Sequence, residues 1–163
     1  RALSLGGPQA DLLLAAHLER RADAARAATG ELGPWTRDLV EARGLYETSV
    51  AKRPSWPIGY LGVLRTRLKE GDLGPGFDDL YRRAASLGLY EPAAQRGLLD
   101  IGLIASPAMD DPGRSAAALV AAAALDQQPR YVLERAAALA TMPVPARLLD
   151  LPGPGPAVDG PSP

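Results

Sequence analysis

The sequence predicts an all-α fold of about seven helices, stacked as antiparallel hairpins, with no strands. Its residues are 47% hydrophobic but 5% aromatic, so the apolar content is mostly alanine and leucine, which favour helices over strands. Proline and glycine recur between apolar stretches of helical length. The breaks between these stretches are short, so consecutive helices are expected to pack antiparallel.

The first four predicted helices are bounded by proline, glycine or a capping side chain. They run from Pro8 to Ala28, from Pro34 to Lys52, from a cap at Ser55 to Gly71, and from Pro75 to Leu87. Proline is tolerated in a first helical turn, whose N–H groups lack intrahelical partners, and the Ser55 hydroxyl can accept a hydrogen bond from one of them. Gly71 ends the third helix because glycine adopts the left-handed closing conformation without steric cost. A break near Arg21 is an alternative within the first helix.

Each of these four helices has an apolar stripe at helical spacing, which predicts the side chains of the core. The stripes are Leu14, Leu18, Ala22 and Ala25; Trp35, Leu39, Ala42, Tyr46 and Val50; Tyr60, Leu61, Leu64 and Leu68; and Phe77, Leu80, Tyr81 and Ala84.

The last three predicted helices are more uniformly apolar. The fifth opens at Glu91-Pro92 and is apolar nearly all round through Ile104, so it is expected at the centre of the fold. The sixth begins at Asp111-Pro112, a cap followed by proline, and its alanines allow close helix approach before it ends at Pro129. The seventh comprises residues 130–141.

Composition divides the chain into two parts. Residues 1–142 form the predicted helical-repeat domain, and residues 143–163 are predicted to be a disordered tail because they are rich in proline and glycine. There are two alternatives to a disordered tail. The tail could be a proline-rich ligand for a recognition domain, or its leucines at 148, 149 and 151 could dock back on the last helices.

Charge and residue usage weigh against several functions. The 18 basic and 19 acidic residues give a net charge of −1, so no global field draws the chain to nucleic acid. The absence of cysteine excludes thiolate catalysis and cysteine-ligated zinc. The longest uncharged apolar run, between Arg114 and Asp126, is shorter than the roughly 20 residues that span a bilayer. The chain opens at Arg1 without an initiator methionine, so we expect a fragment or processed form with room for an upstream membrane anchor.

No complete catalytic or metal site is predicted, so we expect neither enzyme activity nor a cofactor. His17 is the only histidine, and its neighbour Glu19, two residues further on, does not share its helical face. A lone imidazole without thiolates needs several converging carboxylates to bind a metal. The glycines between residues 71 and 76 suggest a phosphate-binding loop, but no Lys-Ser or Lys-Thr follows and the loop joins two helices.

The third and fourth predicted helices match part of a known repeat pattern. Tyr60, Gly71-Asp72 and Ala84 fall close to the aromatic, Gly-Asp turn and small-residue positions of a tetratricopeptide repeat. Leu64 stands where that repeat usually has a small residue, and Gly74-Pro75-Gly76 replaces the usual start of its second helix. The resemblance implies stacked hairpins, while the departures weigh against the repeat's ordinary peptide-binding groove.

Three further segments occur between Trp35 and Ile104. They are residues 42–51, then Arg53-Pro54-Ser55-Trp56-Pro57, then Leu87-Gly88 followed by Glu91-Pro92. Together they resemble the VpsP-type family of polysaccharide biosynthesis proteins, which typically has an RPxWP element followed by another aromatic residue and an LG..EP element one hairpin later. Ile58-Gly59-Tyr60 departs from the usual aromatic spacing, and Leu89-Tyr90 fills the gap before Glu91.

This resemblance implies a function and a location. It implies a helical-repeat accessory protein of bacterial exopolysaccharide biosynthesis or export, anchored upstream and facing the periplasm. Because no catalytic site is predicted, we expect a non-enzymatic scaffold that binds protein partners of that system. A cytoplasmic location is the alternative. Direct binding of an anionic polysaccharide is the alternative function.

Basic side chains form the first candidate binding site. Arg65, Arg67 and Lys69 on the third helix, with Arg82 and Arg83 on the fourth, are predicted to form a basic rim for acidic sugar or phosphate groups. The alternative is that they pair with Glu70, Asp78 and Asp79 on solvated faces.

Arg53, Trp56 and Tyr60 form the second candidate site. They are predicted to expose an aromatic platform on which a sugar ring or a protein partner stacks. The alternative is that Trp56, between two prolines, wedges the corner between two helices.

Overall fold

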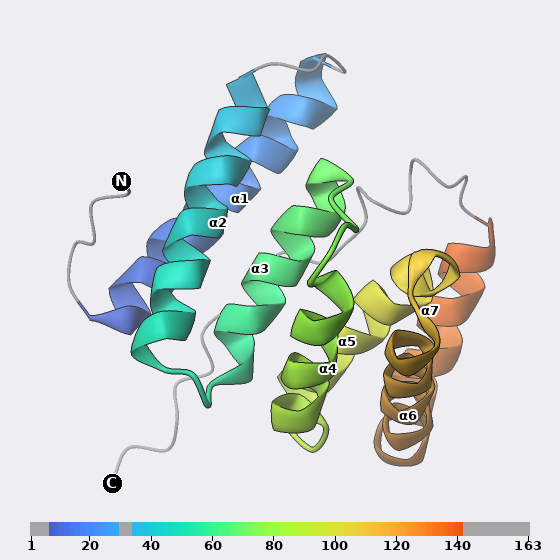
Figure 1. Cartoon of the computed structure of the whole chain (residues 1–163). Coiled ribbons are helices and arrows are strands. Elements are labelled where there is room, and N and C mark those ends of the chain that lie inside the picture. The colour runs from blue at the N-terminus through green and yellow to red at the C-terminus, as the bar shows by residue number, and fades with distance from the viewer. Residues whose placement is uncertain (1–6, 30–33, 142–163) are drawn as a thin grey trace, which may run out of the picture.

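The computed structural model describes residues 7–29 and 34–141. Within these residues it has seven α-helices, one short 3-10 helix and no strand, which confirms the predicted all-α class (Figure 1). The helices are α1 (Pro8–Thr29), α2 (Pro34–Lys52), α3 (Pro57–Glu70), α4 (Phe77–Gly88), α5 (Pro92–Ala105), α6 (Asp111–Gln127) and α7 (Pro129–Thr141), with the 3-10 helix η1 (Ser106–Ala108) between α5 and α6. The predicted tail, residues 143–163, lies outside the described residues.

The helix ends follow the predicted breaks, with local corrections. Trp56, and not Ser55, is the N-cap residue of α3, and its side chain makes no capping hydrogen bond. The cap of α6 is Asp110, one residue before the predicted one, and its carboxylate accepts a hydrogen bond of 2.6 Å from the Gly113 N–H. α1 continues through Arg21 without a break. Gly71 closes α3 in the left-handed conformation, with φ of 74°, as predicted.

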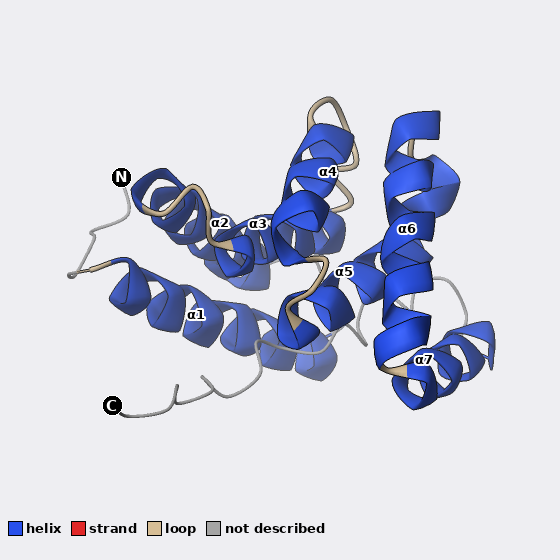
Figure 2. Ribbon diagram, turned by 90° about the horizontal axis from the view of Figure 1, so that it is seen from below, coloured by secondary structure: helices blue, strands red, loops and turns tan. Residues whose placement is uncertain are grey.

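Helices that are neighbours in sequence pack against each other, and some helices two apart also touch. α3 contacts α5 and α4 contacts α6, in addition to the contacts between each helix and the next. Figure 1 shows neighbouring helices running antiparallel, and Figure 2 shows α1 along one side of α2 and α3, far from α6 and α7. The packing is therefore that of stacked helical hairpins.

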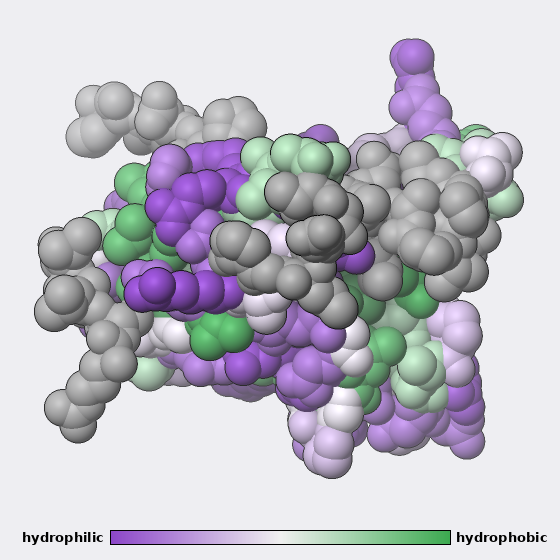
Figure 3. Space-filling view, turned by 90° about the horizontal axis from the view of Figure 1, so that it is seen from above, coloured by the Kyte–Doolittle hydropathy of each residue, from purple (hydrophilic) through white to green (hydrophobic). Residues whose placement is uncertain are grey.

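α3 connects two hydrophobic clusters. The larger joins α3 to α4, α5 and α6 around Leu64, Tyr81 and Ile101, and the smaller joins α3 to α1 and α2 around Tyr46 and Val63. The apolar stripe predicted for α3 is buried along its length. Seen from above, the described surface shows hydrophobic areas separated by hydrophilic ones (Figure 3).

Candidate functional site

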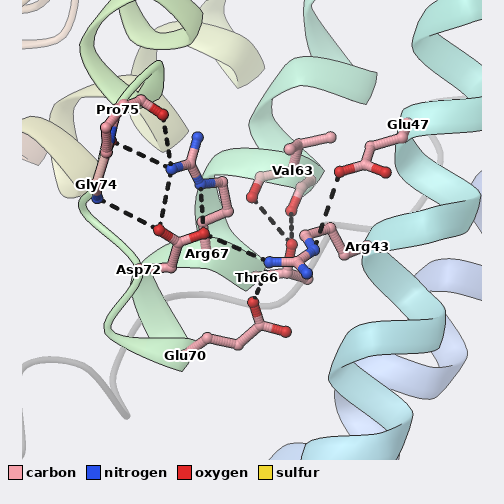
Figure 4. Close-up of polar contacts among 10 residues, drawn as sticks. Arg43, Glu47, Val63, Thr66, Arg67, Glu70, Asp72, Gly74 and Pro75 are labelled. Atoms are coloured by element: carbon pink, nitrogen blue, oxygen red, sulfur yellow. Dashed lines mark hydrogen bonds and ion pairs between the residues drawn. The ribbon is translucent and has the colours of Figure 1, made fainter.

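An open groove of about 430 Å³ lies between α2, α3 and the connection that leads from α3 to α4. Its lining combines apolar and charged side chains: Arg43, Glu47, Val50, Val63, Arg67, Asp72, Pro75, Gly76 and Leu80. Figure 4 shows the two arginines facing each other across Asp72, with Glu47 beyond Arg43.

Arg67 holds the connection that forms one wall of the groove. Its Nε and Nη2 donate to the two carboxylate oxygens of Asp72, at 3.0 and 3.1 Å, and Nη2 also donates to the carbonyls of Gly74 and Pro75. The hydrogen bonds from Arg67 lower the pKa of Asp72, so this carboxylate stays ionised. The glycines that depart from the tetratricopeptide pattern thus form a wall fixed by one arginine.

Arg43 connects α2 to the same network. Its Nη1 donates to Glu70 Oε2 at 2.5 Å and lies 3.5 Å from Asp72 Oδ2, while its Nε lies 3.9 Å from Glu47 Oε1. Burial raises the pKa of Glu70 despite the charge of Arg43, and its Oε1 is buried with no hydrogen-bond partner among the described residues. Arg43 is therefore held by three acidic groups, Glu47, Glu70 and Asp72.

Each of the two arginines keeps a terminal nitrogen without a hydrogen-bond acceptor among the described residues. Nη2 of Arg43 and Nη1 of Arg67 make no hydrogen bond to any described residue. Both arginines line the groove together with the apolar side chains Val50, Val63 and Leu80. Fixed donors next to an apolar surface can bind a group that combines an acceptor with an apolar part, as a peptide side chain does.

The predicted basic rim is wrong for two of its members, because Arg65 and Lys69 are buried. Arg65 donates through Nε and Nη2 to both oxygens of Glu19 on α1, at 2.8 and 2.7 Å, and Lys69 Nζ donates to Glu19 and Asp23. The hydroxyl of Tyr46 on α2 donates to the same carboxylate at 2.9 Å. These cations therefore join α3 to α1 and α2 and do not reach a ligand.

Glu19 remains ionised inside this cluster. Burial by itself raises its pKa, but the charges and hydrogen bonds of Arg65 and Lys69 outweigh burial and lower the pKa to about 2. Burial also raises the pKa of the Tyr46 hydroxyl, which stays protonated and acts as a donor. Sequence spacing gave no sign of this cluster because its members come from three helices.

Of the other members of the predicted rim, Arg67 lines the groove, and Arg82 and Arg83 lie on the surface of α4. Arg82 and Arg83 are both exposed, and Arg82 pairs with Asp79 one helical turn away. This ion pair agrees with the alternative to a basic rim, in which these residues pair with acidic side chains on solvated faces. The five basic residues of the predicted rim are thus divided among a buried cluster, the groove and a solvated helix face.

Only two of the three residues of the predicted aromatic platform, Arg53 and Trp56, reach the surface. Tyr60 is buried, and its hydroxyl donates to the carbonyl of Pro54 at 3.0 Å. Arg53 is exposed and stacks over the half-buried ring of Trp56, with 5.2 Å between the guanidinium carbon and the ring centre. Trp56 also packs against the cluster that joins α1, α2 and α3. Its ring therefore wedges the corner between α2 and α3 and leaves one face beside Arg53.

A third polar cluster joins the last helix to α5 and was missed by the sequence reasoning. Asp100 on α5 is fully buried, and its two oxygens accept hydrogen bonds from the Tyr131 hydroxyl at 2.9 Å and from Arg135 Nε at 2.7 Å. A single acidic residue in a mostly apolar helix was the available signal.

The described residues contain neither a metal-binding cluster nor a membrane-spanning helix. Across residues 7–29 and 34–141, no group of three or more histidine, cysteine, aspartate or glutamate side chains is placed to hold a metal ion. His17 is exposed on α1. None of the helices in the described ranges is both long and apolar enough to cross a membrane.

No family model matches the chain, and no curated protein or solved structure is significantly similar to it.

Proposed function

We propose that this chain is a non-enzymatic, tetratricopeptide-like scaffold that binds protein partners in bacterial exopolysaccharide biosynthesis or export. In this proposal the chain faces the periplasm, held by an anchor upstream of Arg1. The polysaccharide context rests on the resemblance of the segments around Trp56 and Glu91-Pro92 to the VpsP-type family.

The groove between α2 and α3 carries the binding part of the proposal. It is lined by Arg43 and Arg67, which each keep a nitrogen without an acceptor among the described residues, Nη2 and Nη1 respectively, beside apolar side chains. The hydrogen bonds to Asp72 and Glu70 already fix both guanidinium groups. The two arginine side chains therefore lose little conformational entropy when a partner binds there. Arginine in such a setting is typical of residues that dominate protein–protein affinity.

Pull-downs from the native host test this proposal. The wild-type chain and the Arg82→Ala variant are expected to recover components of the polysaccharide assembly or export machinery. Titration of a recovered and purified component is expected to show binding about tenfold weaker for Arg43→Ala than for Arg82→Ala, because Arg82 lies on α4 and does not line the groove. Recovery of no such component above a scrambled-surface control would remove the scaffold proposal. Equal affinity of the wild type, Arg82→Ala and Arg43→Ala for the component would show that the binding site lies outside the groove.

A second candidate function is direct binding of an anionic polysaccharide at Arg53 and Trp56. The exposed guanidinium stacked on the indole is the observation that favours it, because a sugar ring can stack on an aromatic face while the arginine binds its carboxylate. Titration with an anionic exopolysaccharide is expected to quench tryptophan fluorescence in the wild type and in neither Trp56→Phe nor Arg53→Ala. Trp35 is buried and supplies the constant background. A flat titration would remove this candidate.

A further inference from the structure

The charged residues that line the groove differ in how far they reach the surface. The side chains of Glu47 and Asp72 are 59% and 43% exposed, whereas those of Arg43 and Arg67 are 28% and 13% exposed. In Figure 4, Glu47 lies on the far side of Arg43 from Asp72. The charge that the groove presents to solvent is therefore mainly that of its carboxylates.

The positive charges of the two arginines are already matched by neighbouring carboxylates. Arg43 Nη1 lies 2.5 Å from Glu70 Oε2. Arg67 donates to both oxygens of Asp72, at 3.0 and 3.1 Å. A second carboxylate placed on either guanidinium group would lie close to the first and be repelled by it. The remaining donors, Nη2 of Arg43 and Nη1 of Arg67, therefore suit a neutral acceptor such as a peptide carbonyl.

Glu47 is the lining residue whose charge is least compensated. Its Oε1 lies 3.9 Å from Arg43 Nε, beyond hydrogen-bond distance, and neither of its oxygens accepts a hydrogen bond from a described residue. Val50 is three positions further on and so lies beside Glu47 on α2, and Val63 and Leu80 complete the apolar lining. An exposed carboxylate above an apolar surface matches lysine or arginine, whose methylene stem packs on apolar groups while the charged end stays in water.

We propose that the groove binds a segment of a protein partner that carries a lysine or arginine beside apolar residues. In this complex the partner's cationic group pairs with Glu47, and its stem packs on the apolar lining. A backbone carbonyl of the segment accepts a hydrogen bond from one of the two arginines. The inference rests on the proposed binding of a protein partner in this groove, and it names the chemistry of that partner.

Selection from a phage-displayed library of random peptides tests the proposal without the natural partner. The full wild-type chain is expected to select peptides enriched in lysine or arginine next to apolar residues. A selected peptide, synthesised with a fluorescent label, is expected to bind Glu47→Lys about tenfold more weakly than the wild type, because the change replaces an attraction by a repulsion. Replacement of the peptide's basic residue by glutamate is expected to reverse that order.

Two further variants separate the charge of Glu47 from other effects. Glu47→Gln removes the charge and keeps the shape, so a smaller loss of affinity, about threefold, is expected. Glu41→Lys is the matched control, because Glu41 is exposed on the same helix but does not line the groove. It is expected to bind the selected peptide as tightly as the wild type. Circular-dichroism spectra check that all variants keep the helical fold.

Three results would overturn the proposal. Selected peptides rich in aspartate or glutamate that lose affinity for Arg43→Ala would assign the groove to an acidic partner. Equal binding of a basic peptide to the wild type, Glu47→Lys and Glu41→Lys would place that peptide outside the groove. Selection of no peptide at all would also contradict a peptide-binding groove, whereas the scaffold proposal is decided separately by the pull-downs from the native host.

Discussion

The buried carboxylate of Glu19 shows how single residues determine the packing of α1. A fully buried anion is costly unless cations and hydrogen bonds surround it. Here Arg65, Lys69 and Tyr46 donate to it from the two neighbouring helices. Each charge in the cluster is therefore balanced by the others, and loss of one member leaves a buried charge without its counter-charge or hydrogen bond.

Replacement of Glu19 by glutamine is expected to destabilise the fold by about 3 to 5 kcal/mol, because Arg65 loses its buried counter-charge while its shape is kept. Urea unfolding followed by circular dichroism measures the change. The matched control is Asp79→Asn, which removes an exposed pair with Arg82 and is expected to cost less than about 1 kcal/mol. A Glu19→Gln variant as stable as the wild type would show that the cluster contributes nothing to stability.

The pKa of Glu19 predicts how stability changes in acid. The pKa is about 2 in the folded chain against an ordinary 4.5, so folding favours the ionised form. The resulting stabilisation, about 3 kcal/mol, is complete above about pH 4.5 and is lost as the pH falls towards 2. Urea midpoints measured between pH 6 and 2 are expected to fall more steeply for the wild type than for Glu19→Gln. Parallel curves for the two chains would contradict the lowered pKa.

At the scale of elements, the contact between α2 and α3 depends on a glycine. A Cβ built on Gly62 of α3 meets the ring of Tyr46 on α2 at 2.2 Å, well inside van der Waals contact. That ring is buried and its hydroxyl is bound to Glu19, so it has little freedom to move away. The absence of a side chain at residue 62 therefore sets the distance between the two helices.

Gly62→Ala is expected to destabilise the fold by about 1 to 3 kcal/mol through overpacking, although alanine is the better helix former. Gly44→Ala is the matched control, because Gly44 also lies inside a helix but has no atom within 4 Å of a built Cβ. That substitution is expected to stabilise by about 0.5 to 1 kcal/mol. Thermal unfolding of both variants checks the pair. A stabilised Gly62→Ala chain would mean that α2 and α3 separate at little cost.

The same scale shows what the sequence could predict. Local chemistry determines where helices end, so prolines and glycines located the breaks to within a few residues, and the left-handed Gly71 was found from its type alone. The environment of Arg65 and Lys69 was not predictable in this way. Their spacing of four shows that they share a helix face, but burial of that face depends on α1, about 46 residues away in sequence. The groove was missed for the same reason, since Arg43 and Arg67 come from different helices.

At the scale of the whole molecule, the two ends are held to the centre in different ways. α1 packs extensively on α2 and is joined to α3 by the Glu19 cluster. α7 buries one side chain fully, Leu139, and its main polar attachment is to Asp100. Local stability is therefore expected to decrease along the chain, with α7 opening before the helices at the N-terminal end.

Replacement of Asp100 by alanine is expected to release α7 without unfolding the rest of the chain. The change leaves Arg135 and Tyr131 without their shared acceptor and removes a buried ion pair, so the exchange rates of α7 amides are expected to rise about a hundredfold. Amides of α2 and α3 are expected to keep their wild-type rates, because neither helix has more than marginal contact with α7. Hydrogen exchange monitored by mass spectrometry resolves the two regions. Asp126→Ala, an exposed aspartate on α6, is the control and is expected to change neither. A uniform rise across all helices in Asp100→Ala would instead show that the stacked hairpins unfold as one cooperative unit.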